Sequence, residues 1–306
     1  MSKKTKADLA LLAITVVWGA SFPLMKNVLE YVPAYAYITM RYFLAAAVMS
    51  VIFYKELRRI DKQVLKYGSI IGLCMFAGTA LQVVGLYTTT ASNSAFITGL
   101  NVLMVPLIAA IMLKKKPDKA SFTGIIIAFT GLFFFSGGLD FNFNTGDFLT
   151  FISAVCWAFQ IIFIDKFARM TDARLLALIQ VLFVGVAGLC LWVLFDAGKP
   201  VTINGTVIAV LLVTAVLGTA LAFSGQTIAQ KYTTPVHAAL IFTAEPVFAL
   251  VFAMIIPDIY GMTEIPTLTK SIGCVLILAG MVVSELKPIK YLKGKRNLWQ
   301  DSGRPE

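Results

Sequence analysis

The chain contains one histidine and four cysteines among 306 residues. A single histidine excludes a metal site built from several histidines and a proton relay between paired histidines. The cysteines have no CxxC or Cys/His spacing that would indicate a metal or redox motif. All of them lie inside apolar stretches, where packing of the thiol is the plain interpretation: Cys74, Cys156, Cys190 and Cys274.

Sequence motifs of catalysis are absent as well. The chain has no HExxH, no GxSxG and no phosphate-binding P-loop. Glu245 is the only carboxylate well inside an apolar stretch, because Asp165 stands at the end of one. A pair of catalytic carboxylates is therefore excluded within these stretches, and we expect neither an enzyme nor a bound cofactor or metal ion.

Charged residues are scarce, and long apolar runs take their place. Only 14% of residues are charged, 58% are hydrophobic and the mean hydropathy is +0.83, whereas a soluble domain is about 45–50% apolar. A helix that crosses a bilayer needs roughly 20 apolar residues. Ten stretches of about this length predict ten transmembrane helices: 9–28, 36–54, 66–85, 93–113, 121–138, 147–164, 175–195, 207–226, 235–256 and 268–285.

The net charge of +10 is distributed over alternate connections between these stretches. Of the 26 lysines and arginines, 22 lie in the two terminal tails and in every second loop, whereas Lys26, Lys199 and Lys270 lie in the other loops and Arg41 lies within a span. This positive-inside pattern predicts that both termini are cytoplasmic. The basic surface then faces anionic lipid, and nucleic-acid binding is not expected. The first apolar run is too long for a signal-peptide core, so we expect it to stay as helix 1.

The longest polar break, residues 137–147, divides the ten spans into five and five. We expect a first five-helix repeat at 1–138, a second at 139–286 and a basic tail at 287–306. Matching residues support a repeat: Trp18 with Trp157, Arg41 with Gln180, and the Tyr-Thr-Thr turns at 87–89 and 232–234. The tetrapeptide Gly-Thr-Ala-Leu at 78–81 and 218–221 conflicts with the turn register, and we interpret it as a chance recurrence.

Five crossings per half is an odd number, so two homologous halves have opposite orientations in the membrane. The predicted fold class is therefore an all-α integral membrane protein, with ten transmembrane helices as two inverted five-helix repeats. Inverted repeats are typical of transporters whose substrate site lies near the middle of the membrane, between the halves. A ten-span scaffold without transport is the alternative.

Ionisable residues deep in a membrane are costly and are often functional. Glu245 lies about 15 Å from either end of its span, at ~1.5 Å per residue. Such a carboxylate suits two roles, since it can carry a proton or meet a cationic group of a substrate. The structural alternative is a hydrogen bond to a neighbouring helix that holds the kink expected at Pro246.

Arg41 and His237 are the next candidates. Arg41 would anchor a substrate carboxylate or phosphate, and its structural alternatives are snorkelling to the headgroups or pairing with a carboxylate. His237 would contribute to a gate or a protonation switch, and its alternative is a helix cap or an interhelical hydrogen bond. Lys26 and Lys231 stand near helix ends, where an interfacial position is expected.

Uncharged polar and aromatic side chains complete the predicted substrate site. Amides inside lipid must face the protein interior, where they either bond between helices or line a cavity. Paired tryptophans, one in each half, would form the walls of a pocket near the midplane, with packing or an interface belt as the alternative. The residues are Gln82, Asn101, Gln160 and Gln226, together with Trp18, Trp157, Phe22 and Phe223.

These motifs together resemble the ten-helix EamA-type branch of the drug/metabolite transporter superfamily. The resemblance covers about residues 9–285 and rests on the Trp-Gly-Ala-Ser-Phe-Pro run at 18–23, Arg41-Tyr42, the segments 87–93 and 232–240, and Glu245-Pro246. It implies an inverted five-plus-five fold with a cavity built largely by helices 1, 3, 4, 6, 8 and 9. Members often carry Glu-Pro in helix 4 as well, whereas this chain has Leu100-Asn101 at that place in the turn register.

We therefore expect a secondary transporter of the cytoplasmic or inner membrane that exports small organic metabolites by alternating access. Amino acids or related amphipathic compounds are the first choice, and Glu245 suggests drive by protons. Phosphorylated sugars would need several buried cations, and Arg41 is the only buried cation that the sequence predicts. A facilitator or channel, and a scaffold or receptor without transport, are the alternatives. Monomer and homodimer both stay open.

Overall fold

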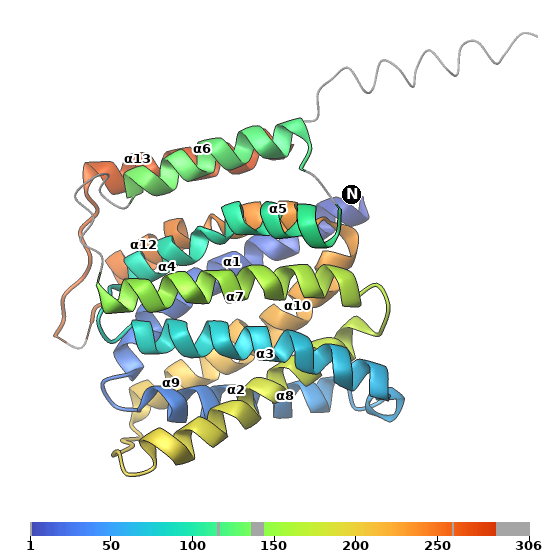
Figure 1. The fold of residues 1–306 in the computed structure, drawn as a ribbon. Helices are drawn as coiled ribbons and strands as arrows, with labels where there is room; N and C mark the ends of the chain where they lie inside the picture. The colour runs from blue at the N-terminus through green and yellow to red at the C-terminus, as the bar shows by residue number, and fades with distance from the viewer. Residues whose placement is uncertain (1, 115–116, 136–143, 259, 286–306) are drawn as a thin grey trace, which may run out of the picture.

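The computed structural model describes residues 2–114, 117–135, 144–258 and 260–285. Within these residues the chain is all helical and contains no strand. Eight helical segments are long and apolar enough to cross a membrane, and two shorter apolar helices, Lys119–Phe135 and Leu268–Ser284, bring the total in the described part to ten. The prediction of an all-α membrane protein with ten spans is confirmed. Figure 1 shows the helices running side by side as one bundle.

The first half contains α1 (Lys3–Val28), α2 (Ala34–Ile52), α3 (Lys62–Gly85), α4 (Ala91–Gly99), α5 (Asn101–Met112) and α6 (Lys119–Phe135). The second contains α7 (Thr145–Phe167), α8 (Ala173–Leu191), α9 (Gly205–Leu212), α10 (Ala222–Ala229), α11 (Pro235–Phe242), α12 (Glu245–Ile255) and α13 (Leu268–Glu285). Short 3-10 turns occur at Leu57–Arg59 and Gln230–Tyr232, and π-helical stretches at Trp192–Asp196 and Val213–Leu221.

Polar side chains at the helix starts explain where the helices begin. A side-chain oxygen in the residue before a helix satisfies one of the backbone N–H groups that the first turn leaves unpaired. Asn144 and Asp147 form a full capping box at the start of α7, and Pro235 occupies the first turn of α11, where a missing N–H costs nothing. The other capping side chains are Ser2, Asp61, Thr90, Asp172, Asn204 and Thr234.

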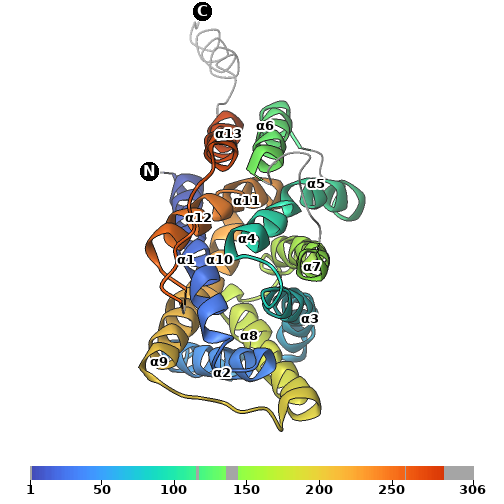
Figure 2. The same ribbon diagram turned by 90° about the vertical axis from the view of Figure 1, so that its left-hand side faces the viewer.

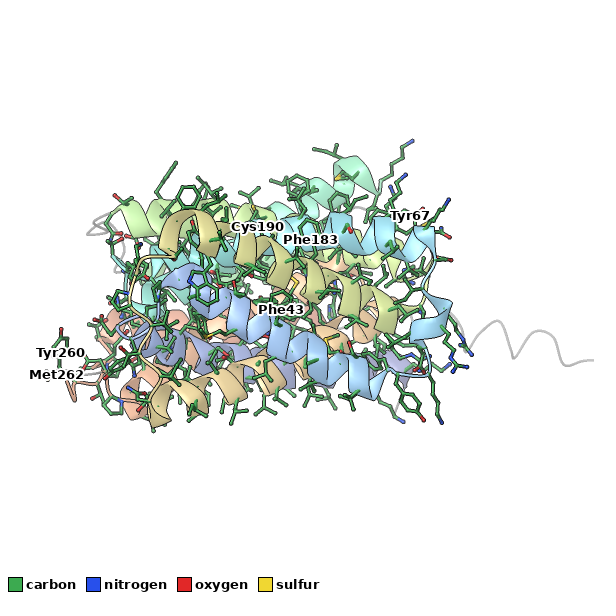
Figure 3. All side chains as sticks on the ribbon, turned by 90° about the horizontal axis from the view of Figure 1, so that it is seen from below. Phe43, Tyr67, Phe183, Cys190, Tyr260 and Met262 are labelled. Atoms are coloured by element: carbon green, nitrogen blue, oxygen red, sulfur yellow. The ribbon has the colours of Figure 1, made fainter. Side chains whose placement is uncertain are left out.

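Glycines set the closest approaches between helices. Gly68 and Gly72 on α3 receive Ile179 and Phe183 of α8, since a Cβ built at either glycine would lie 2.6 Å from those side chains. Phe43 of α2 lies against Gly185 of α8 in the same way, 3.3 Å from a Cβ built there, and Figure 3 shows Phe43 and Phe183 on this side of the bundle. Small residues let helix backbones come close where lipid supplies no hydrophobic drive.

Helices α6 and α13 form a pair at one edge of the bundle, and α2, α8 and α9 lie at the opposite edge (Figure 2). Between these edges the contacts repeat in the two halves. Contacts of α3 with α7 and α8 correspond to those of α10 with α1 and of the π-helical stretch 213–221 with α2. The pairs α2–α8 and α6–α13 join equivalent helices, and the contact of α4 with α12 joins the equivalent fourth and ninth spans. Two repeats of five spans would give this pattern, in which each contact made by a helix of one half has a counterpart in the other half.

The Gly-Thr-Ala-Leu tetrapeptide occupies matching places in this pattern, which argues against its interpretation as a chance recurrence. The ring of Trp157 lies 3.0 Å from a Cβ built at Gly78, and the indole N–H of Trp18 donates to the carbonyl of Gly218 at 3.0 Å. The eighth span has more residues than the third between this glycine and the Tyr-Thr-Thr turn. Gly218 itself lies in the π-helical stretch Val213–Leu221, and such irregular turns are frequent at functional sites.

Two spans are interrupted near their middle. The fourth breaks at Leu100, between α4 and α5, and the ninth breaks at residues 243–244, between α11 and α12. Pro246 has no N–H and would clash with the carbonyl four residues earlier, which belongs to Phe242, the last residue of α11. The kink expected at Pro246 is thus a full break.

The connections alternate between the two ends of the bundle. Figure 3 shows Tyr67 at one end and Tyr260 with Met262 at the other. We call the first the basic end, where the connections 53–61 and 168–172 lie. We call the second the neutral end, where residues 29–33, 86–90, 256–258 and 260–267 lie. The predicted repeat boundary at 138/139 and the basic tail at 287–306 lie outside the described residues.

Packing of α6 on α13 predicts a strong effect of a single methyl group. A Cβ at Gly131 would lie 2.7 Å from the backbone nitrogen of Ile277 and 2.8 Å from the carbonyl oxygen of Gly273. Gly131→Ala should therefore destabilise the protein by about 1–3 kcal/mol, as overpacking does. Thermal unfolding of the detergent-purified protein measures it, with Gly198→Ala as the control because nothing lies near that glycine. An unchanged melting temperature for Gly131→Ala would contradict this packing.

Candidate functional site

A cavity lies inside the bundle between the two halves. Its lining comes from α1, α2, α3, α4 and α5 of the first half and from α7, α10, α11 and α12 of the second. The empty volume is about 580 Å³, counting space that is open to solvent. The resemblance implied helices 1, 3, 4, 6, 8 and 9 as the walls, and the second span contributes as well, through Arg41 and Tyr42.

Most of the side chains that the sequence singled out meet in this cavity. Ten of the eleven predicted site residues line it: Trp18, Phe22, Arg41, Gln82, Asn101, Trp157, Gln160, Phe223, Gln226 and Glu245. They come from spans far apart in the sequence, so their convergence is a property of the fold. Only His237 lies elsewhere among the eleven.

Aromatic rings form one wall. The ring of Trp18 lies 5.2 Å from both Phe223 and Phe242, and Phe223 stacks on Trp157 at 6.0 Å with an interplanar angle of 8°. Such separations are typical of favourable aromatic pairs. The indole N–H of Trp157 is buried without a hydrogen-bond partner among the described residues, whereas that of Trp18 is bonded to Gly218. The wall is apolar, with one unused donor.

Arg41 is the one cation in the described lining, and it is 5% exposed. It stands seven residues into α2, about 10 Å from the start of the helix. Its Nε donates to Thr219 Oγ1 at 2.8 Å, one terminal nitrogen lies 3.1 Å from the sulfur of Met25, and the other donates to the Gly218 carbonyl at 3.4 Å. The guanidinium has more N–H groups than these contacts use.

The surroundings of Arg41 match neither structural alternative. Burial excludes snorkelling to the headgroups, and no carboxylate of the described chain forms an ion pair with it. Two of its acceptors, Gly218 and Thr219, belong to the π-helical stretch of the eighth span. The widened helix thus holds the guanidinium beside the cavity and leaves donors for an anionic ligand.

Glu245 is the only carboxylate in the described lining and is 7% exposed. It is the first residue of α12, directly after the break in the ninth span. In the described chain its side chain has neither an ion pair nor a hydrogen bond, so the interhelical bond that was the structural alternative is missing. Arg41 and Glu245 are therefore opposite charges that line one cavity, and neither forms an ion pair with a described side chain.

Amide side chains bridge the helices of the second half. Gln160 and Gln226 exchange two hydrogen bonds of 3.2 Å, Gln160 also donates to Gln180 at 3.3 Å, and Gln180 donates to Thr227 at 3.0 Å. In the first half, Gln82 donates to Thr98 at 2.8 Å. Asn101 differs, since its Oδ1 is buried with no partner in the described part of the chain.

His237 lies at the basic end, two residues into α11. Its Nε2 is 3.2 Å from the Nζ of Lys4 and 3.6 Å from Asp8 Oδ1, and Lys4 pairs with Asp8 at 3.0 Å. The backbone N–H of His237 is capped by Thr234. The histidine thus links α11 to the start of α1, away from the cavity.

Seven further lining residues escaped the sequence reasoning. Some had a usable signal, because Ser21 and Met25 follow Trp18 at helical spacing and Tyr42 follows Arg41. Others are contributed by helix crossings that no local pattern encodes. The full set is Ser21, Met25, Tyr42, Thr79, Thr98, Ile161 and Phe242. Within the described residues no group of three or more His, Cys, Asp or Glu side chains could hold a metal ion.

The described lining has one carboxylate, one guanidinium and an aromatic wall, inside a bundle of membrane-length helices. Such a cavity can hold a small amphipathic solute. Comparison with known proteins places the fold first. A solved protein crystal structure matches with a TM-score of 0.72 at 16% identity, over 92% of this chain and 96% of the other, which shows a shared fold.

Relatives in sequence are named as transporters. An uncharacterized transporter of Archaeoglobus fulgidus is 33% identical over 93% of this chain and 87% of its own length. The uncharacterized transporter YyaM of Bacillus subtilis is 30% identical over 65% of this chain and 68% of its own. The model of the EamA-like transporter family matches residues 5–137 and again residues 144–285. The chain therefore belongs to the EamA-like transporter family, within the drug/metabolite transporter superfamily.

Proposed function

We propose that this protein is a secondary active transporter that exports small zwitterionic metabolites, amino acids first, by alternating access. The observation that carries the proposal is the pair Arg41 and Glu245. Both are buried, both line the same cavity and neither forms an ion pair with a described side chain. A zwitterion supplies the missing partner of each, its carboxylate for the guanidinium and its ammonium for the carboxylate.

The energetics favour such a ligand. An unpaired charge inside a protein is costly, and a charge-assisted hydrogen bond to a bound group recovers part of that cost. A zwitterion neutralises both sites at once and adds no net charge to the membrane interior. Phosphorylated sugars fit less well, because Arg41 is the single cation in the described lining. The rings of Trp18, Phe223 and Phe242 suit an apolar side chain of the substrate.

Alternating access is supported by matching hydrogen-bonded contacts at the two ends of the bundle. At the neutral end, Lys26 of α1 donates to the carbonyls of Leu86 and Thr89 in the turn before α4. At the basic end, Arg169, just after α7, donates to the carbonyl of Thr233 in the turn before α11. Each of these contacts joins the first span of one half to the turn between the third and fourth spans of the same half. The two halves therefore carry matching contacts at opposite ends of the bundle, which is the arrangement that inverted repeats give.

The orientation follows from the charge pattern of the sequence. We place the basic end in the cytoplasm, with anionic lipid beside it, by the positive-inside rule. Export and an inner-membrane location follow the resemblance to the family. The division into repeats at 1–138 and 139–286 is part of the same proposal.

Saturable counterflow in proteoliposomes tests the transport class. With one labelled amino acid outside and the same amino acid unlabelled inside, a carrier exchanges the label and saturates with concentration. Flux that rises without saturation would indicate a channel or facilitator. Binding of a partner protein with no flux for any solute of the amino-acid panel would indicate a scaffold or receptor.

Drive by protons is assigned to Glu245, the buried carboxylate of the cavity. Glu245→Gln keeps the shape and removes the titrating group, so a pH gradient should no longer accelerate uptake, while counterflow without a gradient should keep a measurable rate. Glu30→Gln is the control, because Glu30 is exposed in the loop between α1 and α2. Gradient-driven uptake that survives in Glu245→Gln would show that another group carries the proton.

The anchoring of a carboxylate by Arg41 predicts a selective loss. Arg41→Gln introduces the amide that the second half carries at the matching position, Gln180. Binding of an amino acid should weaken by about tenfold or more, as expected for a charge-assisted bond, while binding of the corresponding amine, which lacks the carboxylate, should change little. Arg58→Gln, in an exposed loop, controls for the lost charge. Equal losses for both ligands would argue that Arg41 only holds the helices together.

A further inference from the structure

The two interrupted spans place equivalent residues at equivalent points. Asn101 is the first residue of α5 and Glu245 is the first residue of α12, and each follows a break in its span. Both line the central cavity. The turn register of the sequence aligned Glu245 with Leu100, one residue away from the pairing that the helix breaks give. In three dimensions the counterpart of Glu245 is an amide.

The two breaks also pack on each other. A Cβ built at Gly99, the last residue of α4, would lie 3.8 Å from Cγ of Pro246, and α4 and α12 are in contact. Asn101 and Glu245 therefore flank the place where the two broken helices meet. This junction brings the two halves together at the cavity.

Both residues offer oxygen acceptors that have no donor. Oδ1 of Asn101 is buried without a partner in the described chain, and the residue is 4% exposed. The Glu245 carboxylate has no described partner either. Thr98, the polar neighbour one turn before Asn101, uses its hydroxyl to accept from Gln82 and to donate to the Ser94 carbonyl. A buried acceptor without a donor raises the free energy of the protein. A ligand with several N–H or O–H groups would supply the missing donors at this junction.

We propose that Asn101 Oδ1 and the Glu245 carboxylate form the subsite for a primary ammonium group of the substrate. This inference rests on the proposed function and names which cation the site takes. A primary ammonium carries several N–H donors and one positive charge, which matches two acceptors of which one is charged. A quaternary ammonium has no N–H group and would leave both acceptors unpaired, although the nearby rings could hold its charge.

The amide at position 101 has a further consequence for charge. With one carboxylate and one amide, the subsite is neutralised by a single positive charge. A second carboxylate at this place would call for another cation or proton. Asn101 thus limits the subsite to a monocation while it supplies a hydrogen-bond acceptor.

Calorimetric titration of the purified full-length protein tests the subsite with two pairs of probes. The first pair is phenylalanine and N,N,N-trimethylphenylalanine, and the second, without a carboxylate, is 2-phenylethylamine and its N,N,N-trimethyl derivative. We expect each primary amine to bind at least tenfold more tightly than its trimethyl partner. Asn101→Ala should weaken the primary amines on the order of tenfold to a hundredfold and leave the trimethyl compounds unchanged, which also shows that the variant is folded.

Two further variants sharpen the test. Asn93→Ala removes the same side chain eight residues earlier on α4, outside the cavity lining, and should behave as the parent protein. Asn101→Asp keeps an acceptor and should keep the preference for primary amines. Trimethyl compounds that bind as tightly as the primary amines, or an Asn101→Ala variant that weakens all four probes equally, would overturn the subsite.

The probe pairs separate this inference from the proposed function. Binding of 2-phenylethylamine with the expected preference but no binding of phenylalanine would overturn the amino-acid proposal and support the ammonium subsite. Binding of phenylalanine without discrimination against its trimethyl derivative would support the proposed function and overturn the subsite. Absence of binding by all four probes would overturn both.

Discussion

Two opposite charges, Arg41 and Glu245, lie buried in one cavity without an ion pair to any described side chain. The packing of the helices must offset the cost of keeping them there. The helix contacts achieve this through small residues that let backbones approach, such as Gly68 and Gly72 against α8 and Gly131 against α13. The same bundle leaves the cavity between its halves. The charges are therefore held by the rigidity of the surrounding helices, which keeps their binding groups available for a ligand.

Three departures from regular helix serve the cavity. The π-helical stretch of the eighth span presents Gly218 and Thr219 to Arg41, and the breaks of the fourth and ninth spans bring Asn101 and Glu245 to the same space. In lipid, a departure from regular helix is tolerated only where protein or a cavity satisfies the backbone. Interrupted spans thus mark the site, as they do in other transporter folds.

Much of this architecture could be predicted from the sequence. Lipid imposes a length and an apolar composition on each span, so the ten spans could be located from hydropathy, and the rarity of buried charge singled out Arg41 and Glu245. The parts that escaped depend on backbone departures. A longer segment between Gly218 and its Tyr-Thr-Thr turn obscured the match between Gly78 and Gly218. The breaks at Leu100 and at residues 243–244 shifted the partner of Glu245 to Asn101. Thr79 and Ile161 reach the cavity only through helix crossings, which no local pattern encodes.

The central claim is that Arg41 and Glu245 bind the two poles of one zwitterion. Determining the structure of the protein with bound phenylalanine tests it most directly. The account predicts the substrate carboxylate within hydrogen-bond distance of the Arg41 guanidinium and its ammonium within that distance of Glu245, with the ring against Trp18, Phe223 and Phe242. Phenylalanine bound outside this cavity, or bound there with its ammonium away from Glu245, would contradict it.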